Sequence, residues 1–191
     1  EISLGLVGSE MCIRDRLLDC DKNPQLKKGM HGVLANLISV NKEYELAIEM
    51  CLGQALQNVV TETEEDAKKL VEHLRNNNLG RASFLPISSI RGKRIENVIS
   101  NGMKGVIGIA SDLVKCDKKY TQIVLNLLGR TVVVEDMNIG ISLAKMNNYS
   151  FRIVTLKGDV ISSSGSITGG SVATKTVNIL GRSREIEELE K

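Results

Sequence analysis

The chain has 191 residues, of which 42% are hydrophobic and 25% charged, so its composition is that of an ordinary globular protein with a sizeable core. Its 25 Lys and Arg residues against 23 Asp and Glu residues leave a net charge of only +2, which excludes a bulk electrostatic grip on nucleic acid but not a local basic patch. Aromatic residues make up only 3%, which argues against stacking of several bases, and the lack of a long apolar run excludes a membrane span.

The cysteines form no recognisable metal or redox pattern. They lie far apart, and only His31 and His73 could join them; the four are Cys12, Cys20, Cys51 and Cys116. Zinc sites need clustered ligands, so we expect no metal, and a reduced, cytoplasmic protein is the simplest interpretation. No catalytic constellation is recognisable, and we therefore expect no enzymatic activity from this chain.

The first sixteen residues, EISLGLVGSEMCIRDR, show neither a helical nor a strand period. They resemble the translated sequencing adapter that sometimes contaminates proteins inferred from assembled DNA. We therefore expect residues 1–16 to be a non-native tail and exclude them from fold reasoning. The alternative is the frayed end of a preceding element. Residues 17–28 are interpreted as the end of a coiled-coil arm or as a linker.

The first regular elements follow. Residues 32–40 (GVLANLISV) are rich in β-branched and apolar residues and predict a strand. Asn41 is the expected N-cap of a helix whose apolar stripe runs from Tyr44 to Leu52 and which ends at Gly53. A short strand is predicted over residues 57–61.

A second helix is predicted to begin at a capping box formed by Thr63 and Asp66, and Asn76 to Gly80 should end it. The acidic residues at its start are explained by the helix dipole without a bound metal. Its expected buried face contains Ala67, Leu70, Val71 and Leu74. Residues 81–85 predict a further strand, closed by Pro86.

The second half of the chain repeats this order. The apolar helical stripe and the glycine that ends the helix, found at residues 44–53, recur at residues 120–129. Strands are predicted over 131–134 and 152–156. The helix between these strands should turn Ile139, Leu143 and Met146 inward. We infer an internal duplication, and hence a mixed α/β (α+β) fold of two βα-type subdomains, residues 29–92 and 93–178. The connector, residues 91–103, spans the boundary between these two subdomains.

The end of the chain departs from the repeat. Residues 158–171 (GDVISSSGSITGGS) predict two short strands rich in Gly and Ser. The glycines lack the following Lys and Ser or Thr of a phosphate-binding loop, so we expect them to let another backbone approach closely. Residues 179–191 have heptad-compatible spacing, with Ser183 as the expected N-cap, and predict the start of a coiled-coil arm.

Basic residues gather at the edges of the predicted units and indicate a local patch that binds phosphate, the alternative being a solvated surface. The candidates are Lys27, Lys28, Arg91, Lys93, Arg94, Arg182 and Arg184. In an antiparallel rod that enters and leaves one domain, the first two and the last two of these residues should lie close together.

From Gly29 to Lys191 the chain resembles the hinge domain of bacterial, condensin-type structural maintenance of chromosomes (SMC) proteins. The most specific segments are YELAIEMCLGQALQNVV at 44–60, GRASFLP at 80–86 and RIVTLKGDVISSSGSITGGS at 152–171. The order and spacing of these segments hold across both repeats, and ILGRSREIEELEK resembles the start of the returning arm.

The resemblance implies a hinge that homodimerises and so joins two SMC chains in chromosome condensation and segregation, in the nucleoid-containing cytoplasm. It implies that Gly165, Gly169 and Gly170 lie at the dimer interface, with Ser164 standing where the family has a further glycine. It also implies non-specific DNA contact. ATP and Mg²⁺ would bind only at head domains outside this chain, which is also where kleisin-type subunits are expected.

One alternative from another class remains open. Duplicated βα units with Gly-rich turns also build regulatory domains that bind small molecules, with the ligand at a dimer interface. The predicted coiled-coil start near Ser183 favours the hinge, because a small-molecule sensor has no need of a rod at that point. Measurement of the mass in solution would separate a monomer from a two-fold dimer.

Overall fold

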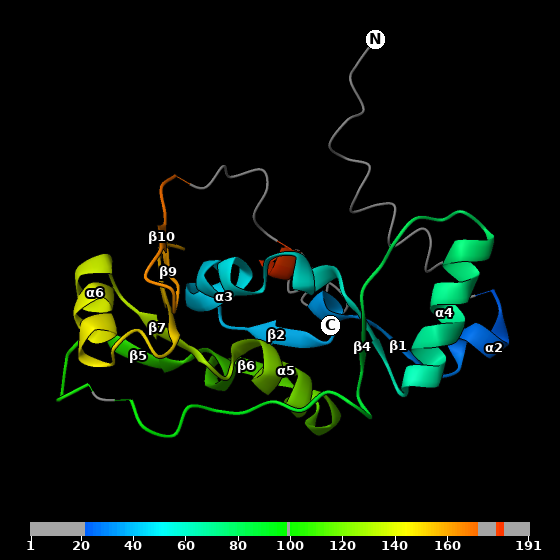
Figure 1. Ribbon diagram of the computed structural model, residues 1–191, viewed down its shortest axis with the longest axis horizontal. Helices are drawn as coiled ribbons and strands as arrows, with labels where there is room; N and C mark the ends of the chain where they lie inside the picture. The colour runs from blue at the N-terminus through cyan, green and yellow to red at the C-terminus, as the bar shows by residue number, and fades with distance from the viewer. Residues whose placement is uncertain (1–21, 99, 172–178, 182–191) are drawn as a thin grey trace, which may run out of the picture. The chain divides into compact units, whose positions relative to one another are not determined.

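The computed structural model describes residues 22–98, 100–171 and 179–181, and in it the chain forms two compact units (Figure 1). Unit 1 contains the described residues up to Leu34 together with Gln57–Ile90, and unit 2 contains Ala35–Leu56 with the described residues from Arg91 onward. The sequence predicted contiguous subdomains divided near residue 92. The structure differs because residues 35–56 pair with the second repeat.

Unit 1 is built on a three-stranded sheet of order β1-β3-β4. Strand β1 (Met30–Val33) runs antiparallel to β3 (Val59–Thr61), and β3 runs parallel to β4 (Phe84–Pro86). Helix α4 (Glu64–Asn76) connects the two parallel strands, and the short helix α2 (Pro24–Lys27) contacts α4. This is the expected strand–helix–strand order, with β4 beginning later than predicted and including Pro86.

Helix α4 begins as the sequence predicted. The Thr63 hydroxyl accepts a hydrogen bond from the Asp66 backbone N–H at 3.2 Å, and the Asp66 carboxylate accepts one from the Thr63 N–H at 3.2 Å. The capping box is therefore confirmed. Leu70 and Leu74 are buried as expected, but the Val71 side chain is 37% exposed, so the predicted buried face is too wide.

The centre of unit 2 consists of equivalent elements from the two repeats. Strand β2 (Ile38–Val40) pairs with β6 (Val114–Cys116), and α3 (Glu45–Leu52) contacts α5 (Thr121–Leu128). Ser39 pairs with Lys115, its own equivalent 76 positions further along the chain, so the two repeats meet about a local pseudo-two-fold axis. This pairing divides the single strand predicted over 32–40.

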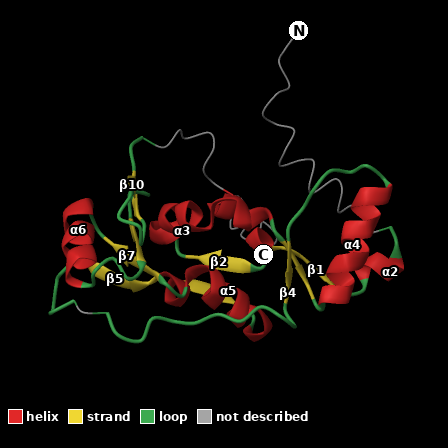
Figure 2. Cartoon of the chain, viewed as in Figure 1, coloured by secondary structure: helices red, strands yellow, loops and turns green. Residues whose placement is uncertain are grey.

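A five-stranded sheet of order β10-β9-β8-β7-β5 forms the rest of unit 2. In this sheet β7 and β8 are parallel, and every other neighbouring pair is antiparallel. The strands are β5 (Val106–Ile109), β7 (Thr131–Val134), β8 (Arg152–Thr155), β9 (Val160–Ile161) and β10 (Ile167–Thr168). Helix α6 (Met137–Met146) packs on β7, β8 and β9, and Figure 2 shows it beside β7.

The core of this sheet is mainly aliphatic, as the scarcity of aromatic residues predicted, with Phe151 as its one buried aromatic side chain among the described residues. It is formed by the buried side chains of Val132, Val134, Leu143, Ala144, Phe151, Ile153 and Ile161. Leu143 is buried as expected from the helical stripe, whereas Ile139 and Met146 are only half-buried.

One predicted cap is not as expected, and the other, Ser183, is not tested by the described residues. Asn41 makes no side-chain capping hydrogen bond, because a 3-10 turn (Lys42–Tyr44) precedes α3 and the α-helix begins only at Glu45. Residues 179–181 are already helical, ahead of Ser183. Ser183 itself and the predicted tail at 1–16 lie outside the described residues.

Candidate dimer interface and basic surfaces

The Gly/Ser-rich segment forms a hairpin at the edge of unit 2. Strand β10 pairs only with β9, through Ile167 opposite Ile161 and Thr168 opposite Val160. Its outer main-chain edge has no strand partner among the described residues. Ile167 is 55% exposed, which is unusual for so large an apolar side chain on a free edge. Such an edge can accept a strand from another chain.

The three candidate glycines have different local reasons to be glycine. Gly165 and Gly170 have φ of +87° and +130°, values that other residues rarely adopt, and a Cβ at either would meet open space. A Cβ at Gly169 would instead clash with the Asp159 carboxylate of the same chain. That carboxylate also accepts a hydrogen bond from the Gly170 N–H at 3.3 Å. The small size of Gly169 is therefore already required inside the protomer.

Ser164, at the position where the resemblance implies a glycine, takes part in the turn of the hairpin. The hydroxyls of Ser162, Ser164 and Ser166, here called the serine cluster, lie within hydrogen-bond distance of one another: 2.6 Å for the first pair and 2.7 Å between the outer two. The Ser166 carbonyl accepts from the Ser162 N–H at 2.9 Å, and the Ser162 carbonyl accepts from the Gly165 N–H at 3.0 Å. These bonds hold the turn that presents β10.

Not every free sheet edge is equally suited to accept a strand. In the two larger sheets, β1 and β5 are edge strands whose register shifts at Gly32 and at Gly108. Irregularities of this kind disrupt the ladder and protect an edge from pairing. The remaining edge strands of these sheets, β4 and β10, have regular registers.

The predicted basic residues are divided between the units. Lys27 and Lys28 are exposed at the end of α2 in unit 1, whereas Arg91, Lys93 and Arg94 are exposed in the connector of unit 2. The remaining two candidates, Arg182 and Arg184, lie outside the described residues. The expected proximity of these arginines to the lysines of α2 stays a prediction.

The connector is fixed against α5 by its main chain. The Gly92 N–H donates to the Gln122 side chain at 3.0 Å, the Asn126 amide donates to the Arg91 carbonyl at 2.9 Å, and the Ile95 N–H donates to the Gly129 carbonyl at 2.9 Å. A Cβ at Gly92 would clash with the backbone of α5. The side chains of the connector are therefore presented from a rigid main chain.

The basic side chains in the connector and beside it differ in whether an acidic side chain already binds them. The Arg94 guanidinium donates to both carboxylate oxygens of Asp112, at 2.6 and 3.1 Å, and Asp112 raises the pKa of Arg94. Lys93 and Arg130 line one open depression of about 710 Å³ together with Glu96 and Asn97. Arg130 donates to the Ser150 carbonyl at 2.8 Å and keeps further donors. Arg130 was not among the sequence candidates, because it lies far from the connector in the chain.

The described residues offer neither a metal centre nor a membrane span. No group of three or more of their His, Cys, Asp or Glu side chains is placed to hold a metal ion. Cys51 and Cys116 are free thiols. No helix in the described part of the chain combines the length and the apolar character needed to cross a bilayer.

Comparison with known proteins gives one consistent family. A family model described as the SMC proteins flexible hinge domain matches residues 27–144. Proteins named chromosome partition protein Smc from Desulfitobacterium hafniense and Bacillus subtilis are 43% and 42% identical to this chain over 96% and 85% of its length. The chain spans only 15% and 14% of the lengths of these relatives.

Solved structures agree with the sequence matches. A crystal structure of an asymmetric dimer of the Geobacillus stearothermophilus SMC hinge domain has a TM-score of 0.78 at 34% identity, and the match covers 95% of this chain and 78% of that one. The Pyrococcus furiosus Smc hinge domain with an extended coiled coil has a TM-score of 0.72 at 30% identity, with 96% and 64% covered.

Proposed function

This chain belongs to the family of SMC flexible hinge domains, and on that premise we propose that it is the homodimerisation module that joins two chains of a chromosome partition protein. The observation that carries this proposal is the open, regular edge of β10 with its exposed Ile167. In this proposal ATP, Mg²⁺ and kleisin-type subunits act at head domains outside this chain, and the assembly works on the chromosome in the nucleoid.

In the proposed dimer, β10 of each protomer pairs with β4 of the other, so the interface consists of two equivalent contacts. Both are edge strands of regular register, whereas β1 and β5 carry bulges. An isologous dimer needs each protomer to offer both surfaces, and this chain has one on each unit. Main-chain hydrogen bonds would supply affinity, and the apolar side chain of Ile167 would be removed from water.

The test is the mass in solution of Ile167→Lys compared with the parent chain. This substitution places a charge on an exposed side chain, so the protomer should still fold. The matched control Ser142→Lys adds the same charge on the exposed side of α6. Light scattering should give a dimer for the parent chain and for the control, and a folded monomer for Ile167→Lys. A parent chain that is monomeric, or an Ile167→Lys chain that stays dimeric, contradicts the proposal.

The Gly169 and Gly170 double alanine variant is a poorer test. A Cβ at Gly169 would clash with Asp159 within the chain, so loss of the dimer would not separate interface damage from hairpin damage. The substitution Ser164→Gly is more informative. It restores the family's glycine and removes one hydroxyl from the serine cluster, and a change in dimer affinity would measure what this departure contributes.

We also propose that unit 2 contacts DNA phosphates through Lys93 and Arg130. Support comes from their common depression and from the fixed main chain of the connector, whereas the Arg94 guanidinium is already engaged by Asp112. Contacts of this kind position DNA without reading its sequence. The lysines of α2 and the arginines at 182 and 184 remain a second proposed patch.

The salt dependence of DNA binding tests whether Lys93 and Arg130 contact phosphates. Removing two phosphate contacts in Lys93→Gln/Arg130→Gln should lower the slope of log affinity against log salt by about 0.9 per contact. The control Lys104→Gln/Lys145→Gln removes the same charge from exposed positions of unit 2. Fluorescence anisotropy with duplex DNA at several salt concentrations would measure both slopes. Equal slopes for the two double variants would contradict the proposed phosphate contacts of Lys93 and Arg130.

A further inference from the structure

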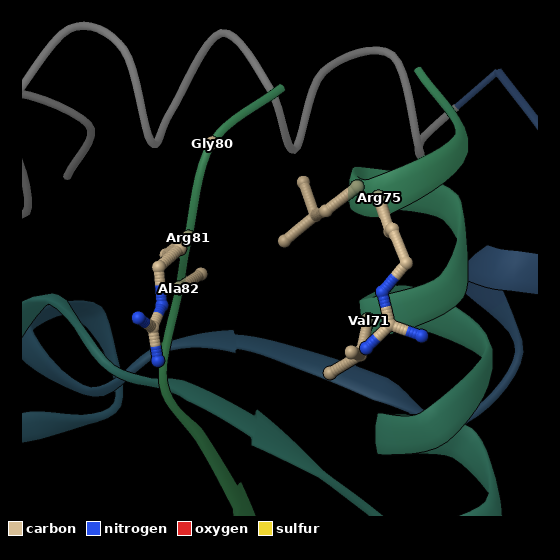
Figure 3. Close-up of a pocket in the computed structure, with 6 residues that line it drawn as sticks. Val71, Arg75, Gly80, Arg81 and Ala82 are labelled. Atoms are coloured by element: carbon tan, nitrogen blue, oxygen red, sulfur yellow. The ribbon is translucent and has the colours of Figure 1, made fainter. Parts of the chain in front are cut away.

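A pocket in unit 1 lies between the end of α4 and the segment that leads to β4. It has a volume of about 430 Å³ and is lined by Val71, Leu74, Arg75, Gly80, Arg81 and Ala82. Figure 3 shows Arg75 on the helix and Arg81 on the opposite wall, with Val71 below Arg75. Neither β10 nor the connector contributes a residue to this pocket.

The backbone creates this arrangement. Helix α4 ends at Asn76, and Asn78 and Gly80 adopt positive φ of 51° and 85°. The Leu79 N–H donates to the Leu74 carbonyl at 2.9 Å, so the chain turns back beside the helix. The turn places Arg81 across the pocket from Arg75, and the apolar side chains of Val71 and Ala82 line the same pocket.

The two guanidinium groups have no acidic partner in the described part of the chain. Neither side chain makes a hydrogen bond or an ion pair there, in contrast to Arg94, which is held by Asp112. The position of Arg75 in the last turn is explained by the helix dipole, but Arg81 lies outside the helix and has no such explanation. Two cations on the walls of one pocket favour the binding of an anion between those walls.

We propose that this pocket binds a small molecule that carries a doubly charged oxyanion on an apolar group. Guanidinium groups form paired hydrogen bonds with phosphate or carboxylate oxygens, and two of them balance a dianion. A phosphoryl group fills only part of the pocket, which leaves room for an apolar portion against Val71 and Ala82. The volume lies in the range of small-molecule sites, roughly 300–1,000 Å³.

A concave, partly apolar site suits a small molecule better than a DNA backbone. Backbone phosphates are contacted by cations that project from a surface, and they bring no apolar group that would cover Val71. The site uses α4 and residues 80–82 and does not use β10 or the connector. Failure of its test and failure of the proposed dimer are therefore distinguishable.

Calorimetry on the full chain with inorganic phosphate and with phenyl phosphate tests the proposal. Both probes should bind saturably, and phenyl phosphate should bind more tightly because its ring contacts Val71. Arg75→Gln/Arg81→Gln should weaken both probes at least about tenfold, the loss expected when a charge-assisted hydrogen bond is removed. The control Lys68→Gln/Lys69→Gln removes equal charge from the same helix and should leave binding unchanged.

Further measurements determine where the phosphate binds and whether it belongs to a small molecule or to DNA. Val71→Ser should remove the preference for phenyl phosphate over phosphate, and amide resonances of residues 71–82 should move on titration. Absence of saturable binding, or equal binding by the arginine variant and the lysine control, overturns the proposal. If the arginine variant loses affinity for a short DNA duplex while neither small probe binds, the site belongs to DNA and the small-molecule assignment is wrong.

Discussion

The Asp159 side chain determines which residues fit in the Gly/Ser-rich segment beside it. Its carboxylate accepts hydrogen bonds from the Thr155 hydroxyl at 3.1 Å and from the Gly170 N–H at 3.3 Å, and it occupies the space beside Gly169. From the sequence, the glycines were expected to let a second backbone approach. In the structure, Gly169 is needed first for Asp159, while Gly165 and Gly170 supply positive φ. Sequence spacing alone cannot separate these reasons.

Cys51 gives a pH prediction at the same scale. Burial raises the pKa of this thiol from 9.0 to about 11, and the charge of Arg152 acts in the opposite direction. Between these values the unfolded chain loses the proton and the folded chain keeps it, so stability is fully present below pH 9.0 and falls as the pH rises toward 11. A difference of one in pKa between the two states corresponds to about 1.4 kcal/mol.

The comparison of parent chain and Cys51→Ala isolates this effect. Urea unfolding across the alkaline range should show a steeper decline in the free energy of unfolding for the parent chain than for the variant. Parallel declines would mean that the thiol ionises equally in both states. Native-state alkylation mapped by mass spectrometry should also be slower at buried Cys51 than at the half-buried Cys116.

Gly129 is predicted to be intolerant of a side chain. A Cβ there would clash with the Lys93 carbonyl of the connector and with the Leu125 carbonyl of α5. Gly129→Ala should therefore destabilise unit 2 by about 1–3 kcal/mol, the usual cost of overpacking. Gly140→Ala is the matched control, since its Cβ would meet the movable end of Ile161 at 3.1 Å, and alanine favours the helix. Thermal unfolding monitored by circular dichroism would compare them.

Helices and strands that local sequence patterns define were predicted correctly. Strands whose limits depend on pairing with residues far along the chain were not. The strand at 131–134, the capping box at Thr63 and the pair of short strands in 158–171 are confirmed. The strand predicted over 32–40 was wrong, because β2 pairs with β6 instead of continuing β1. Nothing within those nine residues indicates a partner far along the chain.

The candidate site shows the same division. The sequence predicted the pair of short strands that contains β10 because Gly and Ser punctuate strands locally. Only the resemblance to SMC hinges implied that the glycines of this segment lie at an interface. The sequence could not identify Arg130, which reaches Lys93 only through the fold, nor the engagement of Arg94 by Asp112. The shared pocket of Arg75 and Arg81 was also missed, because the Asn and Gly residues between them indicate only that a helix ends. The direction of the returning chain depends on the positive φ of Asn78 and Gly80.

The capping box provides a prediction at the element scale. Thr63→Ala removes the acceptor for the Asp66 N–H and should lower the stability of unit 1 by about 1 kcal/mol. Ser89→Ala, an exposed change in the same unit, should have no measurable effect. Urea unfolding would compare the two. A loss of equal size in both variants would show that the cap contributes nothing specific.

At the scale of the whole molecule, duplication leaves each unit with a sheet edge of its own. The repeats contribute β2 and β6 to one symmetric pair, while β4 and β10 remain regular edges on separate units. A chain with two unlike free edges can form a closed two-fold dimer in which both edges are used. In the proposed dimer, stability and assembly are coupled, because a partner would bind only the folded chain.

This coupling predicts a melting temperature that depends on protein concentration. If the folded form is a dimer and the unfolded form a monomer, each tenfold increase in concentration stabilises the folded form by about 1.4 kcal/mol per dimer. The parent chain and Ser142→Lys should therefore melt at rising temperatures as concentration increases, whereas Ile167→Lys should melt at one temperature throughout. Concentration-independent melting of the parent chain would contradict assembly through the exposed Ile167 edge, even if the folds of all three proteins were identical.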